Sequence, residues 1–226
     1  MQPPFPCPVK TWHNDTYEAI SPSRPELSAA SKTIIIIGAG SGIGRETALA
    51  FAAAGASRVA LLGRTEASLE ETASKIKEIG RCSPMIQVAD VTDENELQKA
   101  AASIGKWHVL VLCSGWVVSR FQVNVKGTFL TAKTFLPTAY HSNAAFLAVV
   151  SDISVMPATH LPGLSSYISS NLSQAKIFEF LAAEHPDIFV ATMHPGMIDT
   201  DNFRRTGATA ENLPMDNVRL PTHFLL

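Results

Sequence analysis

Short runs of apolar residues alternate along this chain with longer segments in which apolar residues recur at helical spacing. The first run is Ile34–Ile37, four consecutive isoleucines, which predict a strand buried on both faces. Glycines follow it, and then a segment that carries Ala48, Leu49 and Phe51 on one face and closes at Gly55. This second pattern predicts an amphipathic helix packed on the strand.

The same alternation continues to the end of a sixth predicted strand. The later strands are expected at 58–62, 83–89, 107–112, 144–150 and 189–193. Helices are expected between them at about 65–79, 93–104, 121–140 and 165–184. The first of these has Thr65 as N-cap and an apolar face of Leu69, Ala73, Ile76 and Ile79, and the second has Asp93 as N-cap.

Strands that alternate with helices require crossover connections, and these produce a parallel sheet. The predicted fold class is therefore α/β, a doubly wound parallel sheet in a single domain with six strands. Residues 1–30 are proline-rich and are interpreted either as an irregular arm, with Trp12 and Tyr17 as anchors, or as a disordered tail. Residues 203–226 show no clear seventh strand.

Composition excludes several classes of function. Hydrophobic residues make up 46% of the 226 residues and charged residues 17%, which is typical of a globular domain. The net charge of -2 gives no electrostatic reason to expect binding to nucleic acid or to an anionic membrane. The three cysteines and seven histidines have no metal-ligand spacing. No signal peptide or membrane span is expected, so the predicted compartment is the cytoplasm.

Gly38, Gly42 and Gly44 lie between the first strand and its helix with the spacing G-x-x-x-G-x-G. Glycines at a strand-to-helix turn allow a pyrophosphate to approach the backbone, and the helix N-terminus favours its negative charge. This context favours nucleotide binding over a plain glycine turn.

Two further residues follow strands where a dinucleotide would lie. Arg64 stands where an acidic residue would accept hydrogen bonds from a ribose 2′-hydroxyl, so it favours NADP(H) over NAD(H). The alternative is that Arg64 is a solvated charge in a loop. Asp90 either accepts a bond from an adenine amino group or caps a turn.

Ser154 and Tyr167 are the candidate catalytic pair. A tyrosine at a helix start can donate a proton to a carbonyl oxygen, and a serine hydroxyl can hold that oxygen in place. The pair alone is not specific, because an aromatic residue at a helix start more often serves packing.

Together the motifs of residues 31–202 resemble the short-chain dehydrogenase/reductase family. They are the Gly38–Gly44 turn, Asp90-Val91, Asn124-Val125-Lys126-Gly127, Ser154, Pro162-Gly163-x-x-x-Tyr167, and His194-Pro195-Gly196 with Thr200. The sequence between these motifs is similar to filamentous-fungal members.

The resemblance implies a Rossmann-type dinucleotide-binding domain that exchanges hydride between a nicotinamide and a small carbonyl or alcohol substrate. It implies that Tyr167 is the acid/base, that Ser154 orients the substrate oxygen and that Asn124 holds a relay water. The cofactor would be lined by Gly38, Gly42, Ile43, Gly44, Arg64, Asp90, Gly115, Lys126, Tyr167, Ile198 and Thr200. The resemblance also leaves open whether the protein forms a homo-oligomer, and it suggests a role in fungal secondary metabolism.

This sequence departs from the family pattern in several places. Asn171 stands where the family has a lysine, one helical turn after the tyrosine, and Leu112–Gly115 replaces the motif N-N-A-G. The connection 116–123 is short, and 203–226 is interpreted as a substrate-loop remnant and tail without the family's seventh strand. The sequence therefore leaves open an active reductase, an inactive nucleotide-binding relative, and a fragment that does not fold stably.

Overall fold

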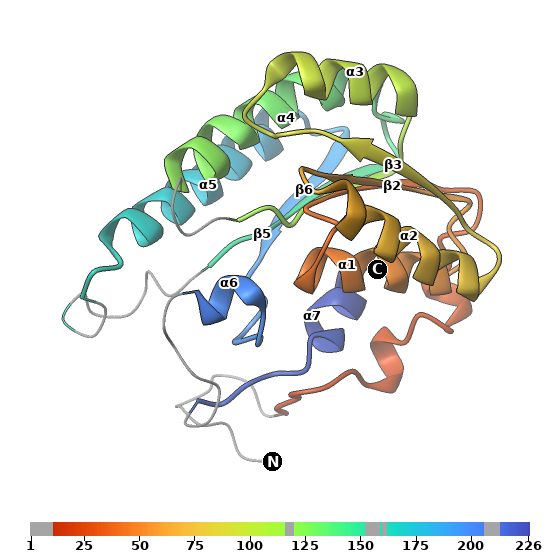
Figure 1. Ribbon diagram of the computed structural model, residues 1–226, viewed down its shortest axis with the longest axis horizontal. Helices are drawn as coiled ribbons and strands as arrows, with labels where there is room; N and C mark the ends of the chain where they lie inside the picture. Colours follow the sequence, from red (N-terminus) through yellow and green to blue (C-terminus); the bar gives the residue numbers. More distant parts are fainter. Residues whose placement is uncertain (1–10, 116–119, 152–158, 160–161, 206–212) are drawn as a thin grey trace.

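The computed structural model describes residues 11–115, 120–151, 159, 162–205 and 213–226 (Figure 1). Within these residues the strands form one parallel sheet with the order β3-β2-β1-β4-β5-β6. The strands are β1 Thr33–Ile37, β2 Arg58–Gly63, β3 Ser83–Val88, β4 Val109–Leu112, β5 Ala144–Val149 and β6 Ile188–Met193. The order runs outward from β1 in both directions, so the predicted doubly wound sheet is confirmed.

Helices cover both faces of this sheet. They are α1 Gly42–Ala53, α2 Glu66–Ile79, α3 Glu94–Ile104, α4 Gly127–Phe135, α5 Ser165–Glu184, α6 Asp201–Arg204 and α7 Arg219–Phe224. In Figure 1, α3, α4 and α5 lie on one side of the strands, and α1, α2 and α7 lie on the other. Among the described residues, no helix is both long enough and apolar enough to cross a bilayer.

The four isoleucines of β1 explain why the central strand is buried on both faces. Ile35 and Ile37 belong to the core beneath α3, α4 and α5. Ile34 and Ile36 belong to the second core, beneath α1 and α2. All four side chains are at most 1% exposed. Because side chains alternate across a strand, an unbroken apolar run fills both cores at once.

The predicted helix 121–140 is divided into three pieces. Phe121–Lys126 forms a π-helix, Gly127–Phe135 forms α4, and Leu136–Thr138 forms a 3₁₀ turn. Pro137 cannot donate a backbone hydrogen bond, which accounts for the end of the regular helix. A π-helical turn has i→i+5 hydrogen bonds in place of the i→i+4 bonds of an α-helix. Such turns occur frequently at functional sites.

Two details of the predicted pattern were wrong. Trp107 lies before β4 rather than in it, and its fully buried indole Nε1 donates to the Phe135 carbonyl at 2.9 Å. A buried indole needs an acceptor for its N–H, which the helix end supplies here. Ile79 is 42% exposed, because it lies in the last turn of α2 and beyond the edge of the core.

Residues 14–16 lie beside α7, more than 200 positions away in sequence (Figure 1). The Asn217 N–H donates to the Asn14 carbonyl at 2.7 Å, and Thr16 Oγ1 lies 2.6 Å from His223 Nδ1. Asp15 forms an ion pair with Arg219 at 3.0 Å. Within the described part of 203–226 the chain forms the end of α6, then α7, and no strand.

We expect the free energy of unfolding to fall as the pH decreases through about 6.5, the ordinary pKa of histidine. His108 Nδ1 accepts a hydrogen bond from the Thr33 N–H at 3.1 Å, so protonation at this nitrogen would break a contact between β1 and the start of β4. Burial, with a smaller contribution from Lys32, lowers the pKa of His108. Between the two pKa values the unfolded chain therefore binds a proton that the folded chain does not. The stability lost at acidic pH is regained when the pH rises above the pKa of His108 in the unfolded chain.

Urea denaturation on both sides of this pH would measure the effect. His108→Asn keeps an acceptor near the Nδ1 position and cannot titrate, so its stability should depend less steeply on pH. His223 contributes in the same direction, since burial lowers its pKa as well, and its contribution is common to both proteins. An equal pH slope in the two proteins would contradict the role of His108.

Candidate functional site

The glycine turn between β1 and α1 brings two stretches of backbone unusually close. A Cβ at Gly44 would lie 2.1 Å from the Gly38 carbonyl oxygen, and Gly38 itself has φ +87°. A Cβ at Gly38 would lie 3.0 Å from the Ser114 nitrogen after β4. The turn is therefore tight because neither position has a side chain, and α1 begins at Gly42 immediately beyond it.

The loop after β6 closes against this turn. The Thr200 methyl group lies 3.1 Å from the position of a Cβ on Gly42, so these two predicted cofactor residues are in contact. Thr200 Oγ1 also caps α6 by accepting from the Phe203 N–H at 3.2 Å. Ile198 is 6% exposed, and Ile43 is half-buried. The structure thus brings the segments that follow β1 and β6 together at the carboxyl edge of the sheet.

Arg64 and Asp90 follow the neighbouring strands β2 and β3, and Arg64 Nη1 lies 3.9 Å from Asp90 Oδ2. The other carboxylate oxygen of Asp90 accepts from the N–H and the hydroxyl of Thr92, at 2.8 and 2.7 Å. Asp90 therefore makes a turn-stabilising contact, as the capping alternative predicts. Its second oxygen lies beside a cation at the sheet edge. Lys126 Nζ donates to the Thr92 carbonyl at 2.9 Å, so it joins the π-helical turn to the same loop.

The loop after β4 lacks the family's asparagines, and its side chains form different contacts. Cys113 N donates to the Ile37 carbonyl at 2.9 Å, which continues the β1–β4 ladder by one residue. Burial raises the pKa of the Cys113 thiol to about 12, against a smaller effect of its hydrogen bond with Thr47. The thiol is therefore not a nucleophile at neutral pH. Gly115 is the last residue of the described range 11–115.

Tyr167 lies in the first turn of α5 and is half-buried. Asn171, one turn later, is 5% exposed, and both ends of its amide are engaged. Its Oδ1 accepts from the Ser151 N–H after β5, and its Nδ2 donates to the Tyr167 carbonyl, each at 2.9 Å. Asn171 therefore connects the end of β5 to α5. Ser154, the expected partner of Tyr167, lies outside the described residues.

Asn124 is 3% exposed and belongs to a buried polar network between the π-helical turn, α4 and α5. Its Nδ2 donates to Ser170 Oγ at 3.1 Å, and Ser170 Oγ donates to the Tyr167 carbonyl at 2.9 Å. Gln174 Nε2 donates to Thr128 Oγ1 at 3.0 Å in the next turn. Asn124 Oδ1 has no hydrogen-bond donor among the described residues. Only the Ser170 side chain therefore lies between Asn124 and the backbone carbonyl of Tyr167 in this network.

Arg120 also belongs to this site, although sequence reasoning did not identify it. Its guanidinium lies over the Tyr167 ring, 5.2 Å from the ring centroid. Its Nη1 donates to Ser166 Oγ at 2.8 Å. No motif or spacing signals this contact, because Arg120 precedes the π-helical turn and meets α5 only through the fold.

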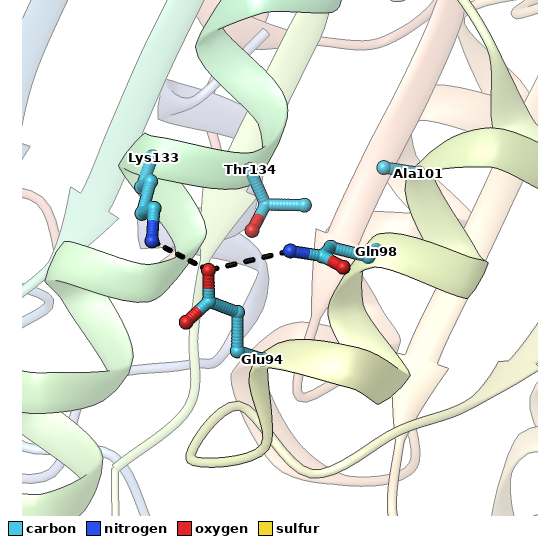
Figure 2. A pocket seen from close by; sticks show the side chains of 5 residues that line it. All are labelled: Glu94, Gln98, Ala101, Lys133 and Thr134. Atoms are coloured by element: carbon cyan, nitrogen blue, oxygen red, sulfur yellow. Dashed lines mark hydrogen bonds and ion pairs between the residues drawn. The ribbon is translucent and has the colours of Figure 1, made fainter.

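A surface hollow between α3 and α4 contains none of the predicted site residues. Figure 2 shows the side chains of Lys133 and Gln98 converging on the Glu94 carboxylate, beside Thr134 and Ala101. Lys133 Nζ lies 2.6 Å from Glu94 Oε1, and Gln98 Nε2 lies 3.3 Å from it. Lys133, Gln98 and Glu94 pair with one another, while Thr134 Oγ1 has no hydrogen-bond partner among the described residues. Among the described residues no cluster of histidine, cysteine and acidic side chains has the arrangement of a metal site.

Comparison with known proteins agrees with the fold and the motifs. The short chain dehydrogenase family matches residues 32–211. A short chain dehydrogenase/reductase of Claviceps purpurea is 31% identical over 98% of this chain and 80% of its own length. Short chain dehydrogenase mpl6 of Monascus purpureus is 30% identical over 91% of this chain and 76% of its own length.

A solved structure extends the comparison of the fold. An alcohol dehydrogenase from Thermococcus sibiricus, complexed with 5-hydroxy-NADP, is 21% identical with a TM-score of 0.75, and the match covers 86% of this chain and 88% of that one. The family match spans the whole sheet, and both curated relatives come from filamentous fungi. The chain therefore belongs to the short-chain dehydrogenase family, as an oxidoreductase of the filamentous-fungal type.

Proposed function

We propose that this protein is an NADP(H)-dependent oxidoreductase that acts on a small carbonyl or alcohol substrate. The observation that carries the proposal is the contact between the glycine turn and Thr200 at the carboxyl edge of the sheet. Ligands of doubly wound sheets lie at this edge, and a turn without side chains lets a pyrophosphate approach the backbone.

The residues at this edge fit a dinucleotide. Gly38, Gly42, Ile43 and Gly44 would hold the pyrophosphate at the start of α1, and Ile198 and Thr200 would cover it. Arg64, 52% exposed, would contact a ribose 2′-phosphate, and Asp90, whose Oδ2 lies 3.9 Å from Arg64 Nη1, would face the adenine. The bound NADP(H) would donate or accept the hydride. The neighbouring alcohol dehydrogenase structure, with its NADP derivative, supports the choice of NADP(H) over NAD(H).

Tyr167 would give its hydroxyl proton to the substrate oxygen, which Ser154 would orient. Lys126, Gly115 and Asn124 complete the proposed site, since the buried Asn124 Oδ1 can accept a hydrogen bond from a relay water. The proposed direction is carbonyl reduction, because that direction needs the protonated form of Tyr167 as the acid. The two fungal relatives support a substrate of fungal secondary metabolism.

A second candidate function is a nucleotide-binding relative with little turnover. One observation favours it. The Asn171 amide is bonded to Ser151 and Tyr167, so this residue is held in the fold and supplies no positive charge to the site. Under this alternative NADPH binds, and no carbonyl compound is reduced.

We expect NADPH to bind more tightly than NADH and Tyr167→Phe to lower carbonyl reduction by at least about 100-fold, the usual range for loss of a general acid. Nicotinamide fluorescence would measure binding, and NADPH consumption over a panel of ketones and aldehydes would measure turnover. Tyr140→Phe, at a surface tyrosine, is the matched control and should retain activity. Binding without turnover in the unmodified protein would favour the second candidate, and no binding of either cofactor would contradict both.

A further inference from the structure

The environment of Tyr167 contains a cation that comes from outside its own helix. Arg120 precedes the π-helical turn Phe121–Lys126, and that turn packs against α5. The guanidinium lies over the face of the Tyr167 ring at 5.2 Å, within the distance of about 6 Å at which a cation is attracted to an aromatic ring. The hydrogen bond from Nη1 to Ser166 Oγ holds it there, one residue before the tyrosine.

Within the described residues, other cations on α5 and on the elements packed against it are directed elsewhere. They are Lys126, bonded to the Thr92 carbonyl, Lys133, paired with Glu94, and Lys176, paired with Glu179. His194, after β6, is a titratable group that lines a hollow together with Ser151 and Asn171. On α5 itself, Asn171 fills the next turn with a neutral amide that is already bonded.

We propose that Arg120 supplies the positive charge beside Tyr167 that a lysine at position 171 would otherwise provide. When the Tyr167 hydroxyl gives its proton to the substrate oxygen, the ring is left as a phenolate. A guanidinium over the ring attracts that negative charge, and an arginine side chain keeps its charge in proteins. Arg120 thus acts through Tyr167 as a positioning residue, and the inference rests on the proposed role of Tyr167 as the acid.

Titration of the tyrosine itself tests this inference without requiring turnover. Near-ultraviolet absorbance follows phenolate formation, and subtracting the curve of Tyr167→Phe removes the signals of Tyr17 and Tyr140. In Arg120→Gln we expect the Tyr167 phenolate to form about one pH unit higher, the lower end of the effect that a nearby opposite charge has on an acidic group. Arg120→Lys should restore most of the shift, because it keeps the charge.

The control is Arg24→Gln, which removes an exposed arginine paired with Glu26 and should leave the titration of Tyr167 unchanged. If Arg120→Gln does not show a cooperative thermal transition, Ser166→Ala replaces it. Ser166 is an exposed residue, so its loss releases the guanidinium without disturbing the core. A smaller shift in the same direction is then expected.

Turnover supplies the second measurement and separates the two proposals. Arg120→Gln should lower the kcat for carbonyl reduction by about 3- to 10-fold, because the rate of general-acid catalysis follows acid strength with a Brønsted dependence. Its optimum should move to higher pH. Identical titration curves in folded Arg120→Gln and unmodified protein would overturn the role of Arg120. Full turnover in Tyr167→Phe would instead overturn the proposed acid, while the titration would still decide whether Arg120 stabilises the phenolate.

Discussion

Gly44→Ala is expected to abolish NADPH binding and to lower the free energy of unfolding by about 3 kcal/mol, the upper end for overpacking a closely packed site. The new Cβ would lie 2.1 Å from the Gly38 carbonyl oxygen and 2.7 Å from its carbon. Both are backbone atoms of the β1–α1 turn, so no side-chain rotation can relieve the contact. The turn must open, and its opening moves the N–H groups that would face the pyrophosphate.

Nicotinamide fluorescence would measure the loss of NADPH binding, and urea denaturation would measure the loss of stability. Gly80→Ala is the matched control, since Gly80 has φ +105° and no atom within 4 Å of its Cβ position. It should cost about 1–2 kcal/mol through backbone strain alone and leave NADPH binding unchanged. Binding of NADPH to Gly44→Ala with unchanged affinity would show that the glycine turn does not hold the cofactor.

Asn171→Ala is expected to lower the free energy of unfolding by about 2 kcal/mol, because it removes both hydrogen bonds of a buried amide. The Ser151 N–H loses its acceptor, while the Tyr167 carbonyl still accepts a hydrogen bond from the Ser170 hydroxyl. For a chain of this size the loss corresponds to a melting temperature lower by roughly 4–8 °C. Thermal denaturation followed by circular dichroism would measure it.

Asn171→Lys should lose a similar amount, because a lysine side chain has no acceptor for Ser151 and would place an ammonium group in a site that is 5% exposed. Restoring the family's lysine is therefore expected to destabilise this protein. Ser173→Ala, at a half-buried position of α5 whose hydroxyl donates to the Ser169 carbonyl of the same helix, is the matched control and should change stability by less than about 0.5 kcal/mol. An Asn171→Lys protein as stable as the unmodified one would contradict the structural role of Asn171.

The sheet and its helices could be predicted because their signals are local. The unbroken run Ile34–Ile37 can be satisfied only by a strand buried on both faces, and the glycines after it leave one compact connection to α1. Asp93 was predicted as an N-cap, and its side chain accepts from the Glu96 N–H at 3.0 Å. Thr65 occupies the predicted N-cap position of α2 without a side-chain hydrogen bond.

The candidate site was less predictable, because its contacts join residues that are far apart in sequence. Arg120 and Ser166 are 46 positions apart, as are Asn124 and Ser170, and no local pattern links such pairs. Asn171 was recognised as a departure from the family, but its bond to Ser151 depends on how α5 docks on the end of β5. Sequence reasoning thus proposed residues for the candidate site, while their partners in the structure depend on the π-helical turn and on the docking of α5.

The contact between residues 14–16 and α7 also constrains the order of events during synthesis. Thr16 and His223 are separated by 207 positions. At about 5–20 residues per second, a ribosome needs roughly 10–40 s to make the intervening chain. Throughout that time the strands β1 to β6 emerge and can pair in sequence order, while residues 14–16 have no α7 to bind. Residues 14–16 are made before the whole sheet, yet they are among the last to reach their final position.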